Sequence, residues 1–353
     1  MKKLLLLSFF VAPFFSGAQV LLTEDFNSLT IGNVASEILG TVPGQGDYLF
    51  FSSNGTAPTT STNAAVTNSQ IVSGGNESLG LQLTGPNGDK GSRFMWQDGF
   101  PTLWNTRALT NNIIELEVDI NPGAGTSTSR NTFGVYIFNA AGDRILGGFF
   151  VRAATRELFV VAYSTPAGNP VGNYNYSLSA APGIQLPADT FSRIGVSYNK
   201  TTGQVLIKGP GIAPAGIAVP GSSAGTDPAE IDFISFSGNT TAAPNTTAAS
   251  MVMDNLTVRA VATDSLLGVN DISDEATFSV YPNPATNFVS VSSNMNLAIN
   301  SIEMFDINGR MVKKISYDAI SNAEVNISDI ATGVYMMKIS SSNGVASKKI
   351  IKQ

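Results

Sequence analysis

The sequence predicts an all-β protein, with a large antiparallel β-sandwich followed by a small one. Short apolar runs alternate with clusters of glycine, proline, asparagine and serine along most of the 353 residues, as strands alternate with turns. Only 13% of the residues are charged, whereas glycine occurs 34 times, a composition typical of β-rich extracellular proteins. The pattern shows no internal repeat, no heptads and no helical periodicity beyond a turn or two.

The start of the chain has the pattern of a cleaved secretory signal. Two lysines precede an apolar run over 4–15, and small residues follow at 16–18. This run is too short to cross a membrane core, which needs about 20 apolar residues, and no later segment is apolar enough. We therefore expect a signal peptide at 1–18, cleavage between Ala18 and Gln19, and no transmembrane segment.

The residue types that the chain lacks exclude several classes of function. It contains no cysteine, so neither disulfides nor thiolate metal sites hold it together. It contains no histidine, which removes the most common general base and zinc ligand. A net charge of −6 and a pI near 4.8 argue against a nucleic-acid partner, because no basic stripe is available to contact phosphates.

The region 19–262 predicts the large sandwich. Residues 113–120 alternate between apolar and acidic side chains, which predicts a strand with one dry and one wet face. Hairpins are predicted over 132–151 and 191–208. Many short antiparallel strands in one region favour a two-sheet sandwich of the jelly-roll type. Further strands are predicted at 157–163, 231–237 and 251–259.

Three pieces of this region resemble parts of concanavalin A-like (laminin G-like) jelly rolls in secreted bacterial proteins. They are LTEDFNS at 22–28, RIGVSYNKTTGQVLIKG at 193–209 and MVMDNLTVR at 251–259. In these domains the first and last strands lie side by side. The resemblance therefore implies that the first and last strands of this region pair, and that 193–209 is a hairpin of the curved sheet.

The acidic residues of 113–120 raise the question of catalysis. Glycoside hydrolases built on this jelly roll carry E-x-D-x-E on one strand, with the outer carboxylates as nucleophile and general acid, about 5–5.5 Å apart in a retaining enzyme. The order here is Glu115, Glu117, Asp119, so the shorter Asp119 would have to act as the acid. The alternative is a solvated row of acids that keeps the strand soluble. We favour this alternative, and so expect no catalytic residues and no enzymatic activity.

A binding site for carbohydrate or another surface ligand is the function that we expect. Sugar recognition needs flat aromatic faces and a few planar hydrogen-bonding groups. Both tryptophans lie in one short stretch beside an arginine and an aspartate, and two tyrosines share one face of 172–177 if that piece is extended. Because large aromatics usually fill cores, we expect at least one of the two tryptophans in the core of the sandwich. Besides a binding protein and an enzyme, a structural adhesin or matrix protein is the third alternative. The candidate ligand-binding residues are Arg93, Trp96, Asp98, Trp104, Tyr174 and Tyr176.

Calcium is the metal that the sequence suggests. If the terminal strands pair, Glu24 and Asp25 would meet Asp254 and supply hard oxygen ligands to a structural ion. The alternative is that these acids cap turns or face water. No other cofactor is expected.

Residues 263–276 are predicted to form a linker, because they are polar and acidic and lack strand alternation. Within this stretch, Asp264-Ser265-Leu266 resembles the D-S/T-aliphatic sequon at which Bacteroidetes O-glycosylate exported proteins. The resemblance makes Ser265 a candidate O-glycosylation site in an exposed linker.

The last part of the chain, 277–353, predicts the small sandwich. The prolines of Tyr281-Pro282-Asn283-Pro284 end a short strand, because proline removes backbone donors. Residues 287–292 alternate as the next strand, and 302–315 form a hairpin around an Asn-Gly turn. With later strands at 334–339 and from 344, we expect a seven-stranded, Ig-like β-sandwich.

Three blocks of this region resemble the type A C-terminal sorting domain of the type IX secretion system of Bacteroidetes. They read FSVYPNPATNFVSVSS, IEMFDINGRMVKK and ISDIATGVYMMKISSSNGVASKKIIKQ. The resemblance implies export through the periplasm, docking on the outer-membrane translocon and removal by a sortase-like peptidase. The passenger would then be released or joined to surface lipopolysaccharide. By resemblance, the sorting signal comprises Tyr281, Pro282, Asn283, Pro284, Gly309, Gly333, Tyr335, Lys348, Lys349 and Lys352, although the lysines alternatively decorate an edge strand.

Overall fold

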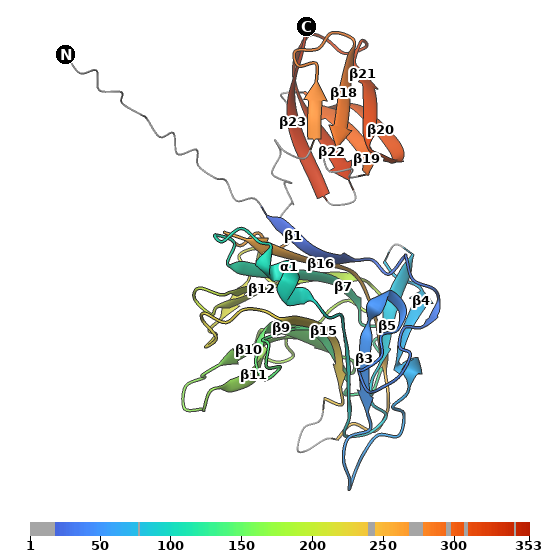
Figure 1. The fold of residues 1–353 in the computed structure, drawn as a ribbon, viewed down its shortest axis with the longest axis vertical. Helices are drawn as coiled ribbons and strands as arrows, with labels where there is room; N and C mark the ends of the chain where they lie inside the picture. The colour runs from blue at the N-terminus through green and yellow to red at the C-terminus, as the bar shows by residue number, and fades with distance from the viewer. Residues whose placement is uncertain are drawn as a thin grey trace, which may run out of the picture.

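The chain is all-β, as predicted, in the computed structural model (Figure 1). Within the described residues, the N-terminal part is a sandwich of two antiparallel sheets, named sheet A and sheet B below, and the C-terminal part forms two smaller sheets. Of the predicted signal peptide only Ala18 is described, and the first strand begins at Gln19. The described residues are 18–76, 78–238, 244–267, 278–293, 298–306, 310–341 and 344–353.

Sheet A has the strand order β14-β13-β12-β7-β16-β5-β4-β2, and β1 also pairs with β16. The first and last strands of the sandwich therefore lie side by side, as the resemblance to concanavalin A-like domains implies; Gln19 pairs with Ala260 and Glu24 with Leu256. The strands are β1 (Gln19–Glu24), β2 (Gly32–Asn33), β4 (Ser69–Ser73), β5 (Leu79–Thr84), β7 (Ile113–Asn121), β12 (Ser192–Asn199), β13 (Val205–Lys208), β14 (Ile217–Val219) and β16 (Ser250–Val261).

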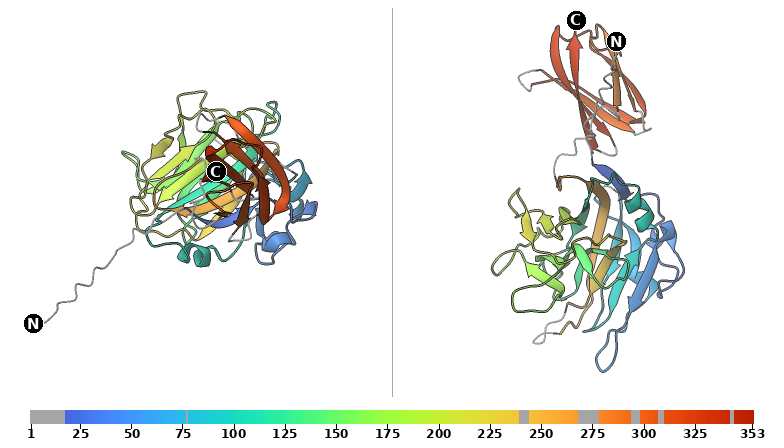
Figure 2. Two further views of the ribbon diagram at one scale, coloured as in Figure 1. Left: turned by 90° about the horizontal axis from the view of Figure 1, so that it is seen from above. Right: turned by 60° about the vertical axis from the view of Figure 1, so that its left-hand side comes forward.

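Sheet B has the order β11-β10-β9-β8-β15-β6-β3 and lies face to face with sheet A (Figure 2). The two predicted hairpins are confirmed as β8–β9 and β12–β13. The strands of sheet B are β3 (Leu49–Ser53), β6 (Ser92–Trp96), β8 (Thr132–Phe138), β9 (Ile145–Arg152), β10 (Leu158–Ser164), β11 (Gly172–Ser177) and β15 (Glu230–Phe236).

The short helix α1 (Phe100–Asn105) is not predicted by the sequence pattern, since six residues are too few to show helical periodicity. It follows Gly99, which has a φ of 98°, and it carries a proline in its first turn, a position where the missing N–H leaves no hydrogen bond unmade. Two 3-10 turns, η1 (Gln45–Asp47) and η2 (Val66–Asn68), connect strands in the N-terminal half.

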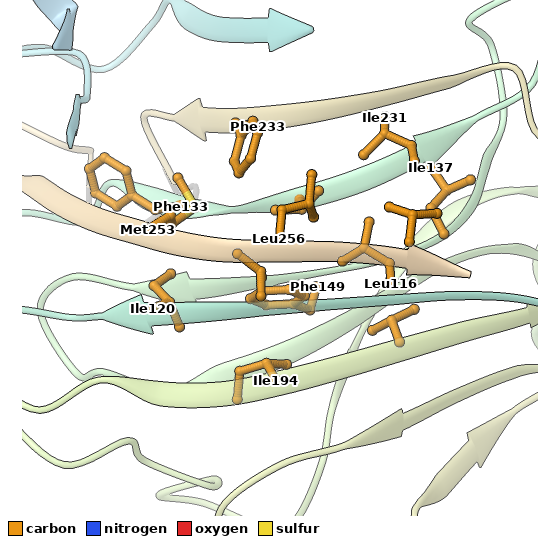
Figure 3. Close-up of a cluster of buried hydrophobic side chains, with 14 of the residues drawn as sticks. Leu116, Ile120, Phe133, Ile137, Phe149, Ile194, Ile231, Phe233, Met253 and Leu256 are labelled. Carbon is orange, nitrogen blue, oxygen red and sulfur yellow. The ribbon is translucent and has the colours of Figure 1, made fainter. Parts of the chain in front are cut away.

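The core lies between sheets A and B and is built from alternate residues of their strands. Every second residue of β7 from Ile114 to Ile120 points inward, and so does every second residue of β8 from Phe133 to Ile137. Figure 3 shows these side chains meeting others from β9, β12, β15 and β16. Each fully buried side chain of this size contributes about 1.5–3 kcal/mol, so this layer is the main source of stability.

The other face of β7 is also buried, so the prediction of a wet face is wrong. Glu115, Glu117 and Asp119 lie on the face away from the core, yet they are almost fully buried. Because β7 is a central strand, Arg259 on β16 and Arg193 on β12 flank its carboxylates. The carboxylates therefore contact arginines of the neighbouring strands, whereas the prediction had them contact water.

Residues 264–267 cover part of this face, which corrects the prediction that they belong to an exposed linker. Leu266 is fully buried, and it packs where a Cβ on Gly195 would lie 2.7 Å from it. Ser265 donates its backbone N–H and its hydroxyl to Glu115, so its hydroxyl is engaged inside the folded unit rather than displayed for glycosylation. The rest of the predicted linker, 268–276, lies outside the described residues.

The C-terminal part packs one small sheet with the order β17-β18-β21 and one with the order β20-β19-β22-β23 around its own core, which includes Val291, Met337 and Ile350. No helix in the described ranges of the whole chain is long and apolar enough to span a membrane. The strands are β17 (Phe278–Tyr281), β18 (Phe288–Ser293), β19 (Ile299–Phe305), β20 (Met311–Ile320), β21 (Asn322–Asn326), β22 (Gly333–Ser341) and β23 (Gly344–Lys352).

Candidate functional site

The outer face of sheet B, which points away from the core, carries a second cluster of aromatic side chains. Strand alternation places it there: inward residues of β8 are separated by the outward Tyr136 and Phe138. The rings contact one another, with Phe94 edge-on to Phe236 at 5.3 Å between ring centroids. Sheet B therefore has two apolar faces, of which only one belongs to the sandwich core. The outer aromatic cluster comprises Phe94, Tyr136, Phe138, Ile145, Phe150, Phe159, Val161, Ile234 and Phe236.

A pocket of about 220 Å³ opens beside this cluster. Trp96 at the end of β6 is half-buried and forms one wall. Its ring packs on Gly40, where a Cβ would come within 2.5 Å of the indole, so residue 40 must lack a side chain for the ring to lie there. The pocket is lined by Phe51, Phe94, Trp96, Phe138, Gly142, Glu230 and Asp232.

Two carboxyl groups from β15 lie in this otherwise aromatic pocket. Asp232 is only 2% exposed, and its Oδ1 accepts no hydrogen bond from any described residue. Burial raises the pKa of Asp232 well above its usual range, and the neighbouring Glu230 carboxyl, to which it is hydrogen-bonded, raises it further. Burial likewise raises the pKa of Glu230, with a smaller contribution from the charge of Asp98. Both carboxyls therefore hold a proton more readily than exposed ones, and the buried Oδ1 of Asp232 has no donor among the described residues.

Replacing Asp232 with asparagine should remove a stability penalty that grows with pH. A carboxyl whose pKa is raised on folding stabilises the folded state below its unfolded-state value, near 3.8, and this contribution is lost as the pH rises towards the folded-state value. An unpaired buried polar group costs at least about 1 kcal/mol, so the variant should melt roughly 2–4 °C above wild type at pH 8. At pH 4 the two should nearly coincide.

Thermal unfolding at both pH values checks this expectation, with the exposed Asp189→Asn as the control. The charge that bears on Asp232 is that of Glu230 on its own strand, while Asp98 beyond β6 acts on Glu230, and the neutral Tyr136 is the register partner of Asp232 on β8. A pH profile of stability that is unchanged in Asp232→Asn would contradict a raised pKa of Asp232 in the folded state.

The structure brings one of the predicted ligand-binding residues, Trp96, to the lining of this pocket; the exposed Asp98 lies outside the lining, although its charge acts on Glu230. Arg93 faces the opposite side of β6 and is fully buried, where its guanidinium donates to Ser53 O at 2.6 Å and to Asn63 Oδ1 at 2.8 Å. It is a structural residue, and the prediction that it contacts ligand is corrected.

Trp104 is the tryptophan that fills the core. It lies on α1, is 1% exposed, and donates its indole N–H to Asp227 Oδ1 at 2.6 Å. The guanidinium of Arg107 lies over its ring at 4.0 Å. With its faces and its polar atom occupied, Trp104 cannot stack on a ligand, which corrects its prediction as a ligand-binding residue.

Tyr174 and Tyr176 share one face of β11, as predicted, but this is the face that continues the core side of sheet B. Tyr176 packs against the core, and its hydroxyl is 2.6 Å from that of Ser164. The Tyr174 hydroxyl donates to Pro170 O at 2.7 Å. Both tyrosines therefore lie on the other face of sheet B from Trp96 and cannot join its pocket.

The predicted calcium ligands do not come together. Glu24 accepts hydrogen bonds from Phe26 N and Tyr48 OH, Asp25 accepts one from Asn27 N, and Asp254 accepts one from Asn76 N at 2.7 Å. Across the described ranges, no group of three or more acidic side chains is placed to hold a metal ion. Asp25 caps a local turn, whereas Glu24 also binds the Tyr48 hydroxyl and Asp254 binds the backbone of the distant Asn76.

The acids of β7 form a buried ion-pair network. Arg259 binds Glu115 at 3.4 Å and also Glu117, and Arg193 lies 3.4 Å from Glu117 and 3.2 Å from Asp119. Burial raises the pKa of Glu115, against the lowering effects of the Ser265 N–H and the Arg259 charge. A glycosidase needs two carboxyls open to a sugar, whereas these are covered and engaged with arginine. The ion pairs of the β7 acids therefore hold neighbouring strands of sheet A together.

The predicted sorting residues cluster around the last strand. The Asn283 side chain donates to Lys349 O at 2.7 Å and accepts from Ile351 N at 2.9 Å, so it ties the turn after β17 to β23. Tyr335 is buried, and its hydroxyl donates to Ala331 O. Of the remaining residues, Tyr281, Pro282, Pro284 and Lys349 are exposed, Lys348 and Lys352 are half-buried, Gly333 begins β22, and Gly309 lies outside the described residues.

Together these features define a two-sheet β-sandwich followed by a smaller β-unit with a core of its own. Residues 279–353 match the family model of the secretion system C-terminal sorting domain. The chain thus carries a type IX sorting tail, interacts with that secretion system, and is secreted or attached to the outer cell surface.

Solved structures similar to the chain include the cellulose-induced protein Cip1, at 10% identity and a TM-score of 0.41 over 69% of this chain and 97% of that one. They also include the PL-14 alginate lyase of Aplysia kurodai, at 8% identity and a TM-score of 0.42 over 68% and 98%. A third is the alginate lyase vAL-1 of Chlorella virus, at 12% identity and a TM-score of 0.37 over 65% of this chain and 100% of that one. No curated protein matches the chain.

Proposed function

We propose that the protein is an exported, non-catalytic β-sandwich that binds carbohydrate in the aromatic pocket on the outer face of sheet B. The observation that carries the proposal is the half-buried Trp96 beside the half-buried carboxyl of Glu230 and the buried carboxyl of Asp232. An aromatic wall offers C–H stacking to a sugar ring, and a few convergent polar groups fix its orientation. The covered ion-pair network on the outer face of β7 offers no comparable open site.

The sorting domain delivers this binding unit to the outside of the cell. In our proposal it docks on the type IX translocon and is removed by a sortase-like peptidase. Because Ser265 and Leu266 pack on sheet A, the cut falls after Leu267, so that the mature unit keeps the segment that covers Glu115.

Binding of the full chain to an array of neutral, acidic and amine-bearing oligosaccharides tests the proposal. Trp96→Ala should weaken retention at least roughly tenfold, which corresponds to about 1.4 kcal/mol. Trp104→Phe is the matched control, because it alters the core tryptophan and leaves the pocket intact. Equal retention by wild type and Trp96→Ala would contradict a site at this pocket, and absence of retention by any glycan would favour a structural adhesin. Release of shortened sugars would instead indicate an enzyme.

A further inference from the structure

The charge of the pocket narrows the class of ligand. Its described lining contains two carboxyls, from Glu230 and Asp232, and no lysine or arginine, and Asp98 adds a third acid nearby. The other lining groups are aromatic rings and a glycine. Neither the aromatic walls nor the acids attract a negatively charged ligand, so uronate-type sugars are disfavoured.

The same groups are complementary to a protonated amine. Aromatic faces attract a cation through their quadrupole, and the interaction reaches about 2 kcal/mol or more where water is excluded. An ammonium group donates three hydrogen bonds, and Asp232 Oδ1 is a buried acceptor without a donor among the described residues. A charge-assisted bond from the ligand would satisfy that oxygen.

Resting on the function proposed above, we propose that the pocket selects glycans that carry free amino groups, with a glucosamine-type residue seated against Trp96 and its ammonium bound by Asp232 and Glu230. The volume of about 220 Å³ is below the roughly 300–1,000 Å³ of sites for larger ligands, so the pocket holds one sugar residue of a chain. The rest of the chain lies outside the pocket.

Titration calorimetry of the full chain at about pH 6 tests the selection with three probes: a β-1,4-linked glucosamine tetramer, its fully N-acetylated counterpart and a tetragalacturonate. Acetylation removes the charge while keeping the sugar ring. We expect the amine form to bind at least tenfold more tightly than the acetylated form, and tetragalacturonate to bind most weakly.

Asp232→Asn should reduce this preference to less than threefold, because it keeps the side-chain shape and removes the carboxylate. The variant should remain folded, since it removes a stability penalty, and Asp189→Asn, at an exposed residue that does not line the pocket, should behave as wild type. Equal binding of the amine and acetylated forms would overturn the selection but leave carbohydrate binding intact. Absence of binding to any probe or array glycan would overturn both.

Discussion

Replacing Arg259 with methionine should lower the unfolding free energy of the N-terminal sandwich by about 3–5 kcal/mol. The guanidinium is almost completely buried and binds both Glu115 and Glu117. Methionine fills much of the same space, so packing changes little, but the buried Glu115 loses its counter-charge and Glu117 keeps only the partly exposed Arg193. Removing one partner of a buried ion pair costs far more than the pair itself contributes.

Denaturant unfolding followed by tryptophan fluorescence measures this effect selectively, because both tryptophans lie in the N-terminal sandwich. Arg193→Met is the matched control: its side chain is one-third exposed, so water screens its pairs with Glu117 and Asp119, and the loss should be about 1 kcal/mol or less. Adding Glu115→Gln and Glu117→Gln to Arg259→Met should restore part of the stability. Equal losses of unfolding free energy in the two arginine variants would show that Arg259 is not the main counter-charge of the buried carboxylates.

The ion-pair network shows why the alternating pattern predicts the strand β7 correctly but wrongly predicts that its outer face is exposed to solvent. Alternating apolar and acidic residues define a strand, and one apolar face of that strand does form the core. The same pattern is silent on what covers the acids, since Arg259 lies 144 residues from Glu115 along the chain. A solvated row and a row of buried ion pairs look identical until the neighbouring strands are known.

The candidate site shows a second limit. Their proximity in sequence predicts that Arg93 and Trp96 belong to one cluster, but residues three apart on a strand point to opposite faces. Recognition of 92–96 as a strand would have separated them. The acids of β15 have a detectable strand pattern, because Glu230 and Asp232 alternate with Ile231 and Phe233. Their pocket, however, also needs Phe51 and Phe138 from other strands, and no local sequence pattern predicts that these strands are neighbours.

Shortening Leu266 to alanine should also destabilise the N-terminal sandwich, by about 2–5 kcal/mol. This side chain is fully buried against Gly195, although it belongs to a segment with no strand pattern. Leu267→Ala is the matched control, since its side chain is partly exposed and should cost no more than about 1 kcal/mol. The same fluorescence-detected unfolding distinguishes them, and similar small losses would mean that 264–267 does not belong to the folded unit.

The effect of Leu266 should also depend on Arg259. By anchoring the segment, Leu266 holds the N–H groups of Ser265 and Leu267 against Glu115 and Glu117, so its removal admits water to the same carboxylates that Arg259 neutralises. Once water reaches them, loss of the guanidinium costs less. The double variant Leu266→Ala/Arg259→Met should therefore lose at least about 1 kcal/mol less than the sum of the single variants, as expected for sites that share partners. Strict additivity would show that the segment and the ion pairs stabilise the sandwich independently.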